Sequence, residues 1–331
     1  MTLLRAARRG LLMRRSAGGG APAAPLHLEL TGEGIAAVTA VACRRAGLPR
    51  AGARLLKFTN NAVVALPAAG AVLRIAGSAG ARSRVPAVLA VARWFEDLRL
   101  PAVRLLPGLP QPLEVEGHLV TVWRAVEPGP GPRVGEAPVE DLARILRALH
   151  SVEAPPPSAV GPWNPPGVLR SRLAEAQGVS EGDAEFLTRE VGAVEAGLAA
   201  LADVEPLLPT GVLHGDAYLG NLVPSRSGPQ LCDFDGVARG PREWDLVPVA
   251  VGALRFDYGH DLHRRFVHAY GVDVTAWPGF PALRRLRELQ LVTSVLPALG
   301  ANPALRPQWR LRLDSLRHGD DGVRWSPYPW A

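Results

Sequence analysis

The spacing of apolar residues changes after the first helical stretch of the chain. Between residues 31 and 47, apolar side chains recur at helical spacing, with Thr31 placed to cap a helix and Gly47 to end it. Three short β-like runs follow, separated by turn-forming residues, at positions 53–56, 62–66 and 71–75. This change of period predicts one helix followed by a three-stranded antiparallel meander, with the folded part beginning near Leu26.

The remaining pattern is mostly helical. A helix is predicted over residues 82–98, with Val85, Val88 and other apolar residues on one face. Two further strand-like runs cover residues 103–106 and 119–124. Helical patterns then occupy residues 139–152, 168–175, 183–202, 244–256, 261–270, 282–299 and 307–316. Strands gathered early and helices gathered late predict an α+β chain.

The composition is that of a globular protein. The chain has 331 residues, of which 47% are hydrophobic and 21% charged, enough for two lobes of ordinary domain size. Cys43 and Cys232 lie in apolar runs, so we expect buried thiols rather than a disulfide or a metal site. No run approaches the roughly 20 apolar residues that span a bilayer. We therefore expect no membrane association and a cytoplasmic location.

The positive charge is concentrated at the start of the chain. Residues 1–25 contain five arginines and no acid, against a net charge of +6 for the whole chain. This arm has no apolar stretch long enough for a secretory signal and ends in Gly, Ala and Pro. It is predicted to be a disordered basic extension; upstream coding, or a transit-type or membrane-surface arm, is the alternative. The other arginines are scattered without interleaved aromatic residues, so nucleic-acid binding is not expected.

The stretch from 211 to 249 carries the candidate chemistry. The triplet His-Gly-Asp ends at Asp216, Asn221 follows five residues later, and Asp233 comes after a turn. Short apolar runs on either side of that turn predict a hairpin that brings Asn221 and Asp233 together at one end. Magnesium takes oxygen ligands from one or two protein groups plus substrate phosphates. Asn221 and Asp233 would be such ligands.

This order of carboxylate, amide and carboxylate is the layout of a kinase catalytic loop followed by its metal-binding aspartate. Here Gly215 replaces the arginine of the usual loop, and Asp235 replaces the glycine of the DFG motif. Asp245 follows Gly240 downstream. With these features the stretch resembles the aminoglycoside phosphotransferase and choline kinase-like family, whose members are small-molecule kinases.

The resemblance implies a role for each matching residue. Asp216 would be the catalytic base, Asn221 and Asp233 the ligands of Mg²⁺, and Asp245 a structural residue beneath the loop. ATP or GTP would be the phosphoryl donor, and the acceptor would be a hydroxyl of a small molecule. The functional class expected is therefore a magnesium-dependent phosphotransferase, acting as a monomer or homodimer.

The resemblance also implies a fold. It is a two-lobed α+β protein-kinase-like architecture, with a small N-lobe at residues 26–126 and a mainly helical C-lobe at residues 127–331. The N-lobe would hold an antiparallel sheet that covers the nucleotide. The C-lobe would hold the catalytic loop and the acceptor, so the active site is expected in the cleft between the lobes.

The nucleotide-covering turn departs from a glycine-rich loop. Thr59, Asn60 and Asn61 offer hydroxyl and amide donors there, although a plain hairpin turn explains the same residues equally well. Arg74 closes the third strand, where kinases place a phosphate-contacting lysine, and its fork can bind phosphate oxygens. The helix glutamate that pairs with this cation in the family falls on Val88 here, which leaves the partner of Arg74 undefined.

Two other classes of function remain as alternatives. The apolar Val88 suits a pseudokinase-like nucleotide-binding regulator, and His214, Asp216 and Asp233 could instead be the ligands of a metal-dependent hydrolase. The acceptor itself is not specified. Residues 251–331 hold seven acidic residues against eleven arginines, which favours a neutral or anionic acceptor over a polycationic aminoglycoside.

Overall fold

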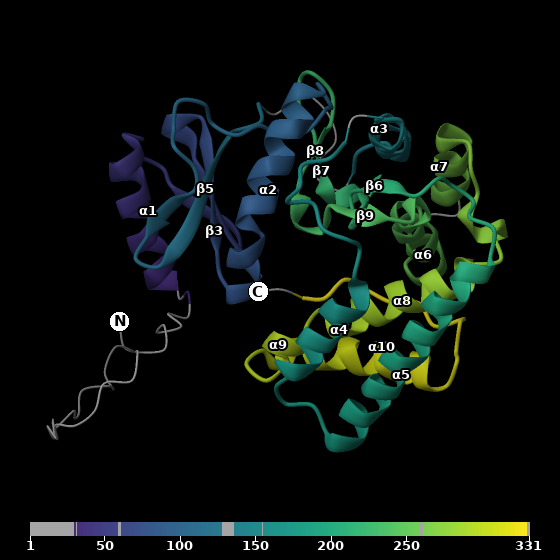
Figure 1. Ribbon diagram of the computed structural model, residues 1–331. Coiled ribbons are helices and arrows are strands. Elements are labelled where there is room, and N and C mark those ends of the chain that lie inside the picture. Colours follow the sequence, from purple (N-terminus) through teal and green to yellow (C-terminus); the bar gives the residue numbers. More distant parts are fainter. Residues whose placement is uncertain are drawn as a thin grey trace, which may run out of the picture.

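The computed structural model describes residues 30, 32–58, 61–127, 136–153, 155–258 and 261–329. Figure 1 shows two lobes, one built on a β-sheet and the other mainly helical, as the sequence predicts. The expected extension at residues 1–25 and the capping residue Thr31 lie outside the described residues.

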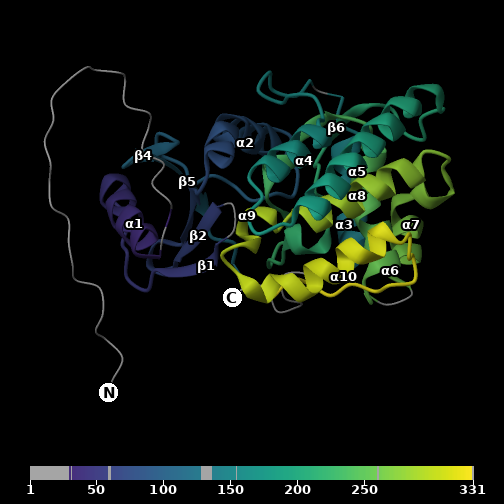
Figure 2. The same cartoon turned by 90° about the horizontal axis from the view of Figure 1, so that it is seen from below.

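The N-lobe is an antiparallel sheet between two helices. Its strand order is β1-β2-β3-β5-β4. The strands are β1 (Arg54–Phe58), β2 (Asn61–Leu66), β3 (Ala71–Ala76), β4 (Leu113–Val115) and β5 (His118–Arg124). Alternate strand residues such as Val64, Leu73 and Val122 are buried with one face of α1 (Gly32–Ala46), whereas α2 (Ala79–Asp97) lies on the other side of the sheet (Figures 1 and 2).

The predicted strand at residues 103–106 is wrong. The fifth strand is β4 instead, and Leu105 forms only an isolated bridge with Trp123. The amide of Val103 donates to the carbonyl of Leu231 in the other lobe at 3.0 Å, whereas Arg104 and Leu106 keep backbone hydrogen bonds to β5. The side chain of Gln111 also bonds the amide and the carbonyl of Val122, at 2.7 and 3.0 Å. The Gln111 side chain thus bonds backbone groups of β5 that a longer edge strand would have paired with.

The C-lobe contains the remaining helices and four short strands. The helices are α3 (Val139–His150), α4 (Pro165–Ala174), α5 (Glu181–Ala200), α6 (Val247–Arg255), α7 (Leu262–Tyr270), α8 (Phe280–Thr293), α9 (Leu296–Leu299) and α10 (Arg306–Arg317). The strands form two hairpin-like pairs, β6 (Gly211–Leu213) with β9 (Ala238–Gly240) and β7 (Leu222–Val223) with β8 (Gln230–Leu231). One large hydrophobic core runs through this lobe and reaches Phe95 of α2, whose ring meets Phe234 edge to face at 5.1 Å.

Helix boundaries differ from the periodic pattern at two places. The helix predicted over residues 282–299 is split into α8 and α9, and Pro297, in the first turn of α9, has no amide proton to continue a helical ladder. The helix predicted from 244 begins as a 3₁₀ turn, Arg242–Asp245, before α6. That turn places Asp245 beneath the catalytic stretch.

The sequence predicts no membrane-spanning helix and no disulfide, and the described residues bear on both predictions. Within the described part of the chain, no helix has both the length and the apolar character needed to cross a bilayer. Cys43 and Cys232 are free thiols, the first buried and the second half-buried. Burial raises the pKa of Cys232 to about 12, so this thiol stays protonated at neutral pH.

The segment after α10 folds back over the C-lobe. Trp325 is buried; its amide donates to the carbonyl of Arg255 at 2.5 Å and its indole N–H to the hydroxyl of Ser315 at 3.1 Å. Arg312 donates to the carbonyl of Ser326 at 2.5 Å, and its guanidinium stacks 3.8 Å from the ring centroid of Tyr328. The aromatic C-terminal segment therefore packs on the C-lobe over its described residues.

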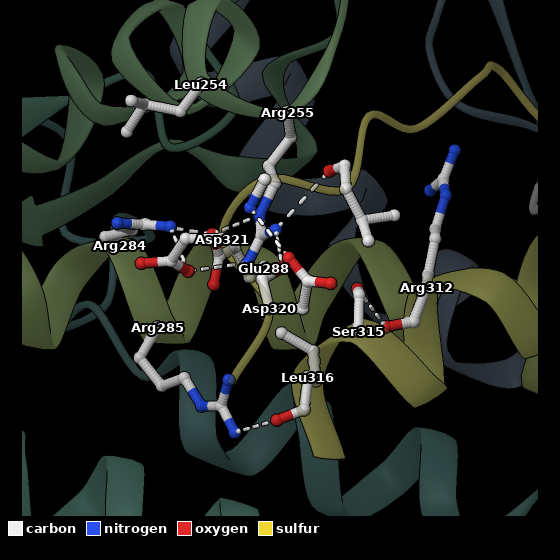
Figure 3. Close-up of polar contacts among 12 residues, drawn as sticks. Leu254, Arg255, Arg284, Arg285, Glu288, Arg312, Ser315, Leu316, Asp320 and Asp321 are labelled. Carbon is white, nitrogen blue, oxygen red and sulfur yellow. Dashed lines mark hydrogen bonds and ion pairs between the residues drawn. The ribbon is translucent and has the colours of Figure 1, made fainter. Parts of the chain in front are cut away.

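A buried arginine organises the turn that starts this segment (Figure 3). Arg255 donates to Glu288 of α8 at 2.7 Å and to the carbonyl of Asp320 at 2.8 Å. Asp321 accepts from both Arg255 and Arg284, at 3.1 and 2.6 Å. Arg255 and Glu288 are almost fully buried, and each has a second ion-pair partner, Asp321 for Arg255 and Arg284 for Glu288.

Replacing Trp325 by alanine is expected to lower the free energy of unfolding by about 3–5 kcal/mol, the usual cost of removing a large buried aromatic side chain. Chemical denaturation would measure the change. Trp325→Phe should recover part of the loss, since it keeps a buried aromatic ring but removes the indole hydrogen bond and some buried area. A change below about 1 kcal/mol in the alanine variant would show that the segment is not packed as described.

Candidate active site

The loop that carries the His-Gly-Asp triplet follows β6 and is held from below by Asp245. The Asp245 carboxylate accepts hydrogen bonds from the amides of His214, at 2.6 Å, and Gly215, at 2.8 Å. It is fully buried and also lies 3.1 Å from Nε2 of His150, whose other ring nitrogen contacts the hydroxyl of Tyr270 at 2.7 Å. Asp245 therefore occupies the structural position beneath the loop that the sequence predicts, and His150 packs against it.

Glycine is required at position 215. Its φ of +85° lies in the left-handed region, and a Cβ there would sit 2.0 Å from the carbonyl oxygen of Gly236. The carbonyl of Gly215 also accepts from the indole of Trp244 at 2.9 Å. The arginine found at this place in protein kinase loops would not fit, which explains the replacement seen in the sequence.

Asp216 reaches the cleft with its side chain 40% exposed. Nδ2 of Asn221 donates to the backbone carbonyl of Asp216 at 2.8 Å and lies 3.4 Å from the Asp216 carboxylate. Asn221 therefore fixes the conformation of the loop. Nη1 of Arg287, from α8, contacts the other carboxylate oxygen of Asp216 at 2.9 Å. Sequence reasoning missed Arg287, because it lies 71 residues away on a helix whose pattern marks it only as a polar position.

The predicted hairpin is present. Leu222 pairs with Leu231 and the amide of Cys232 donates to the carbonyl of Asn221 at 2.9 Å, so Asn221 and Asp233 lie at the same end. The structure thus brings Asn221 beside Asp216 through its side chain, and beside the Asp233 segment through its backbone.

The electrostatics of Asp233 fit a cation site. Burial, and next the charge of Asp235, raise the pKa of Asp233, with Asp216 adding in the same direction. One carboxylate oxygen of Asp235 is buried without a hydrogen-bond partner. The repulsion between the carboxylates of Asp233 and Asp235, and the unpaired oxygen of Asp235, suit the binding of a divalent ion. Carboxylate oxygens are the hard donors that Mg²⁺ prefers.

The donor set is incomplete without substrate. No group of three or more His, Cys, Asp or Glu residues in the described ranges forms a self-sufficient metal site. His214 is buried, and its Nε2 lies 3.0 Å from the carbonyl of Cys232, so this histidine bonds the hairpin. Two protein ligands plus phosphate oxygens match magnesium in phosphoryl-transfer sites. A hydrolase centre built on His214, Asp216 and Asp233 finds no such support.

The partner of Arg74 is Asp235. Their side chains form an ion pair across the lobes, and Nδ2 of Asn61 lies 3.3 Å from the same carboxylate oxygen. Val88 is buried in α2, so Asp235 supplies the carboxylate that this helix lacks. Lys57, on β1, is exposed. The predicted nucleotide-covering residues Thr59 and Asn60 lie outside the described residues.

The two lobes enclose one cavity of about 620 Å³. Asn61, Asp216, Asp233 and Asp235 all contribute to its wall. The C-lobe side is built from α4, α6, α8 and the C-terminal segment, with Tyr258 and Tyr328 among the aromatic residues. The cavity therefore extends from Asn61 on the sheet side, past Asp216, Asp233 and Asp235, to a helical chamber of the C-lobe.

Comparison with known proteins places this site in a family. No curated protein matches the chain. A choline/ethanolamine kinase family protein from Mesorhizobium loti is 19% identical and superposes with a TM-score of 0.56, covering 84% of this chain and 92% of its own. An aminoglycoside phosphotransferase from Streptomyces rimosus is 18% identical, with a TM-score of 0.56 over 77% and 98%. An amicoumacin kinase in complex with AMP-PNP and Ca²⁺ is 12% identical, with a TM-score of 0.63 over 89% and 98%.

At these identities the likeness shows the kinase-like fold. The sequence itself matches the phosphotransferase enzyme family over residues 24–289, which is most of the chain. This match confirms the resemblance carried by residues 211–249 and supports a small-molecule phosphotransferase activity. The chain belongs to the phosphotransferase enzyme family.

Proposed function

We propose that the protein is a magnesium-dependent phosphotransferase that moves the γ-phosphate of ATP or GTP to a hydroxyl of a small molecule. The observation that carries the proposal is the position of Asp216. Its carboxylate, 40% exposed, lies on the wall of the same cavity as Asp233 and Asp235. A proton acceptor is thus close to groups suited to a metal and its phosphates.

Each residue has a distinct task in this proposal. Asn221, through its amide oxygen, and Asp233 would hold Mg²⁺, which when bound neutralises phosphate charge. Asn61 lines the cavity on the sheet side, and Arg74 bonds the same Asp235 oxygen as Asn61; the N–H groups of both residues would bind phosphate oxygens. Asp216 accepts the proton of the acceptor hydroxyl late in a loose transition state, so its orientation matters more than its basicity.

The surrounding contacts supply that orientation. Asp245 holds the two amides that precede Asp216, and Asn221 holds the carbonyl of Asp216 itself. Because the backbone at and before Asp216 is held in this way, its carboxylate reaches the acceptor in one geometry. Such positioning is the main protein contribution to phosphoryl transfer.

A screen of metabolite extracts tests the proposal. The protein is incubated with Mg²⁺ and ATP carrying a labelled γ-phosphate, and labelled small molecules are identified against a control with Asp216→Asn. A product formed only by the wild type is expected. Magnesium-dependent nucleotide binding without a product in any extract would favour the nucleotide-binding regulatory alternative, and the absence of nucleotide binding would reject both.

A further inference from the structure

Two arginines lie next to Asp216 on the C-lobe side of the cavity. Arg287 of α8 contacts Asp216 at 2.9 Å, and Arg172 of α4 donates to the carbonyl of Gln290 at 3.1 Å. Nη1 of Arg287 also lies 3.4 Å from the side-chain oxygen of Gln290. Both arginines are half-buried and line the cavity. Gln290 thus joins two guanidinium groups beside the proposed base.

The charges of this chamber do not balance. The described charged residues of the cavity wall are Arg84, Arg172, Arg287, Arg312, Asp216, Asp233 and Asp235. Asp235 already pairs with Arg74 and Asp233 is assigned to the metal, while Arg312 bonds the C-terminal segment. Asp216 alone remains to face Arg84, Arg172 and Arg287.

The excess of positive charge affects the pKa of Arg172. Burial lowers the pKa of Arg172 to about 10; the charges of Asp216 and, less strongly, Glu175 oppose this, whereas Arg287 and Arg84 lower the pKa further. Even so, the guanidinium remains charged at neutral pH. Partly desolvated cations next to one another are unfavourable unless an anion joins them.

We propose that the acceptor carries an anionic group, a carboxylate or a phosphate, next to its reacting hydroxyl, and that Arg172 and Arg287 bind this group. The proposal rests on the phosphotransferase function proposed above. Guanidinium forks bind carboxylate and phosphate oxygens in a bidentate manner. A polycationic aminoglycoside would instead bring ammonium groups against these arginines.

The contact between Arg287 and Asp216 also bears on the proposed base. Arg287 holds one oxygen of Asp216. An acceptor anion competes for the same guanidinium, and its binding releases that oxygen to receive the hydroxyl proton. Anionic acceptors therefore gain both in affinity and in turnover over neutral compounds of the same shape.

The test uses matched acceptors that differ in charge: glycerol with glycerate, and a hexose with its uronate, its 6-phosphate and its 2-amino derivative. Transfer of labelled γ-phosphate gives kcat and KM for each, and calorimetry without nucleotide gives binding of each compound directly. The wild type should favour the anionic members. Arg172→Gln should raise KM or Kd for these by about 10- to 100-fold, as expected for a charged hydrogen bond, and change the neutral members less than about threefold.

Arg170→Gln is the control, because Arg170 lies on the same helix, is 68% exposed and pairs with Glu195 away from the cavity. It should behave as the wild type. Arg287→Gln should lower kcat as well as affinity, since it contacts Asp216.

Three results would overturn the proposal: equal or better use of the neutral or amino compounds, anionic compounds that do not bind the wild type, or loss of nucleotide rather than acceptor affinity in Arg172→Gln. The last would assign these arginines to the donor phosphates. The nucleotide itself separates the two proposals. If nucleotide binding needs magnesium but anionic compounds fail to bind, the acceptor class alone is wrong. If nucleotide does not bind at all, the phosphotransferase function fails, and calorimetry still decides whether the arginines bind anions.

Discussion

Replacing Asp216 by asparagine is expected to lower turnover by roughly 100- to 10,000-fold, the range for loss of a general base. Asparagine keeps the size of the side chain and an oxygen for Arg287, so the loop and the contact seen at 2.9 Å should persist. What disappears is the ability to take the proton of the acceptor hydroxyl. Steady-state kinetics with the acceptor found in the extract screen would measure the effect.

Nucleotide binding is the control for this variant. The fall should appear in kcat, while the affinity for magnesium-ATP, measured by calorimetry, changes little. A variant that phosphorylates the same compound at a rate near that of the wild type would show that another group accepts the proton.

Replacing Asp233 by alanine is expected to weaken binding of magnesium-nucleotide by at least about 10- to 100-fold, the loss already caused by removing groups that only support a metal ligand. The physical reason is that the cation would lose one of its two proposed protein ligands. Calorimetry with ATP in the presence of Mg²⁺ would measure it.

Removing Mg²⁺ with a chelator tests the same metal assignment independently. EDTA should reduce nucleotide affinity in the wild type and add little in Asp233→Ala. Asp203→Ala, which removes an exposed carboxylate on the C-lobe surface, is the matched control and should resemble the wild type. Nucleotide affinity that survives both chelation and the loss of Asp233 would contradict the metal assignment.

Local sequence was sufficient for the parts of the site that are close together in the chain. The spacing from Asp216 to Asn221 and the short apolar runs at residues 222–223 and 230–231 predict a loop and a hairpin, and the structure has both. These elements depend on turns of a few residues, whose chemistry is visible in the letters. The antiparallel meander of the N-lobe was predictable for the same reason.

Contacts between distant elements were not predictable. Arg287 and Arg172 lie on helices whose pattern shows only that they are polar, and nothing in one sequence tells which polar residue faces a cleft. The same holds for Asp235 as the partner of Arg74, 161 residues away. The strand placed at residues 103–106 is reduced to an isolated bridge on β5, because the backbone of Val103 bonds the other lobe, a tertiary effect that local β-propensity does not reveal.

The pairing of Arg74 with Asp235 has a consequence for regulation. In protein kinases the strand cation depends on a glutamate of the neighbouring helix, so rotation of that helix disconnects the pair and switches the enzyme off. Here the carboxylate comes from the loop that also carries Asp233, and α2 meets that loop through apolar rings such as Phe95 on Phe234. Rotation of α2 would leave the charge pair intact, so control by helix displacement has no charge contact to break in this protein.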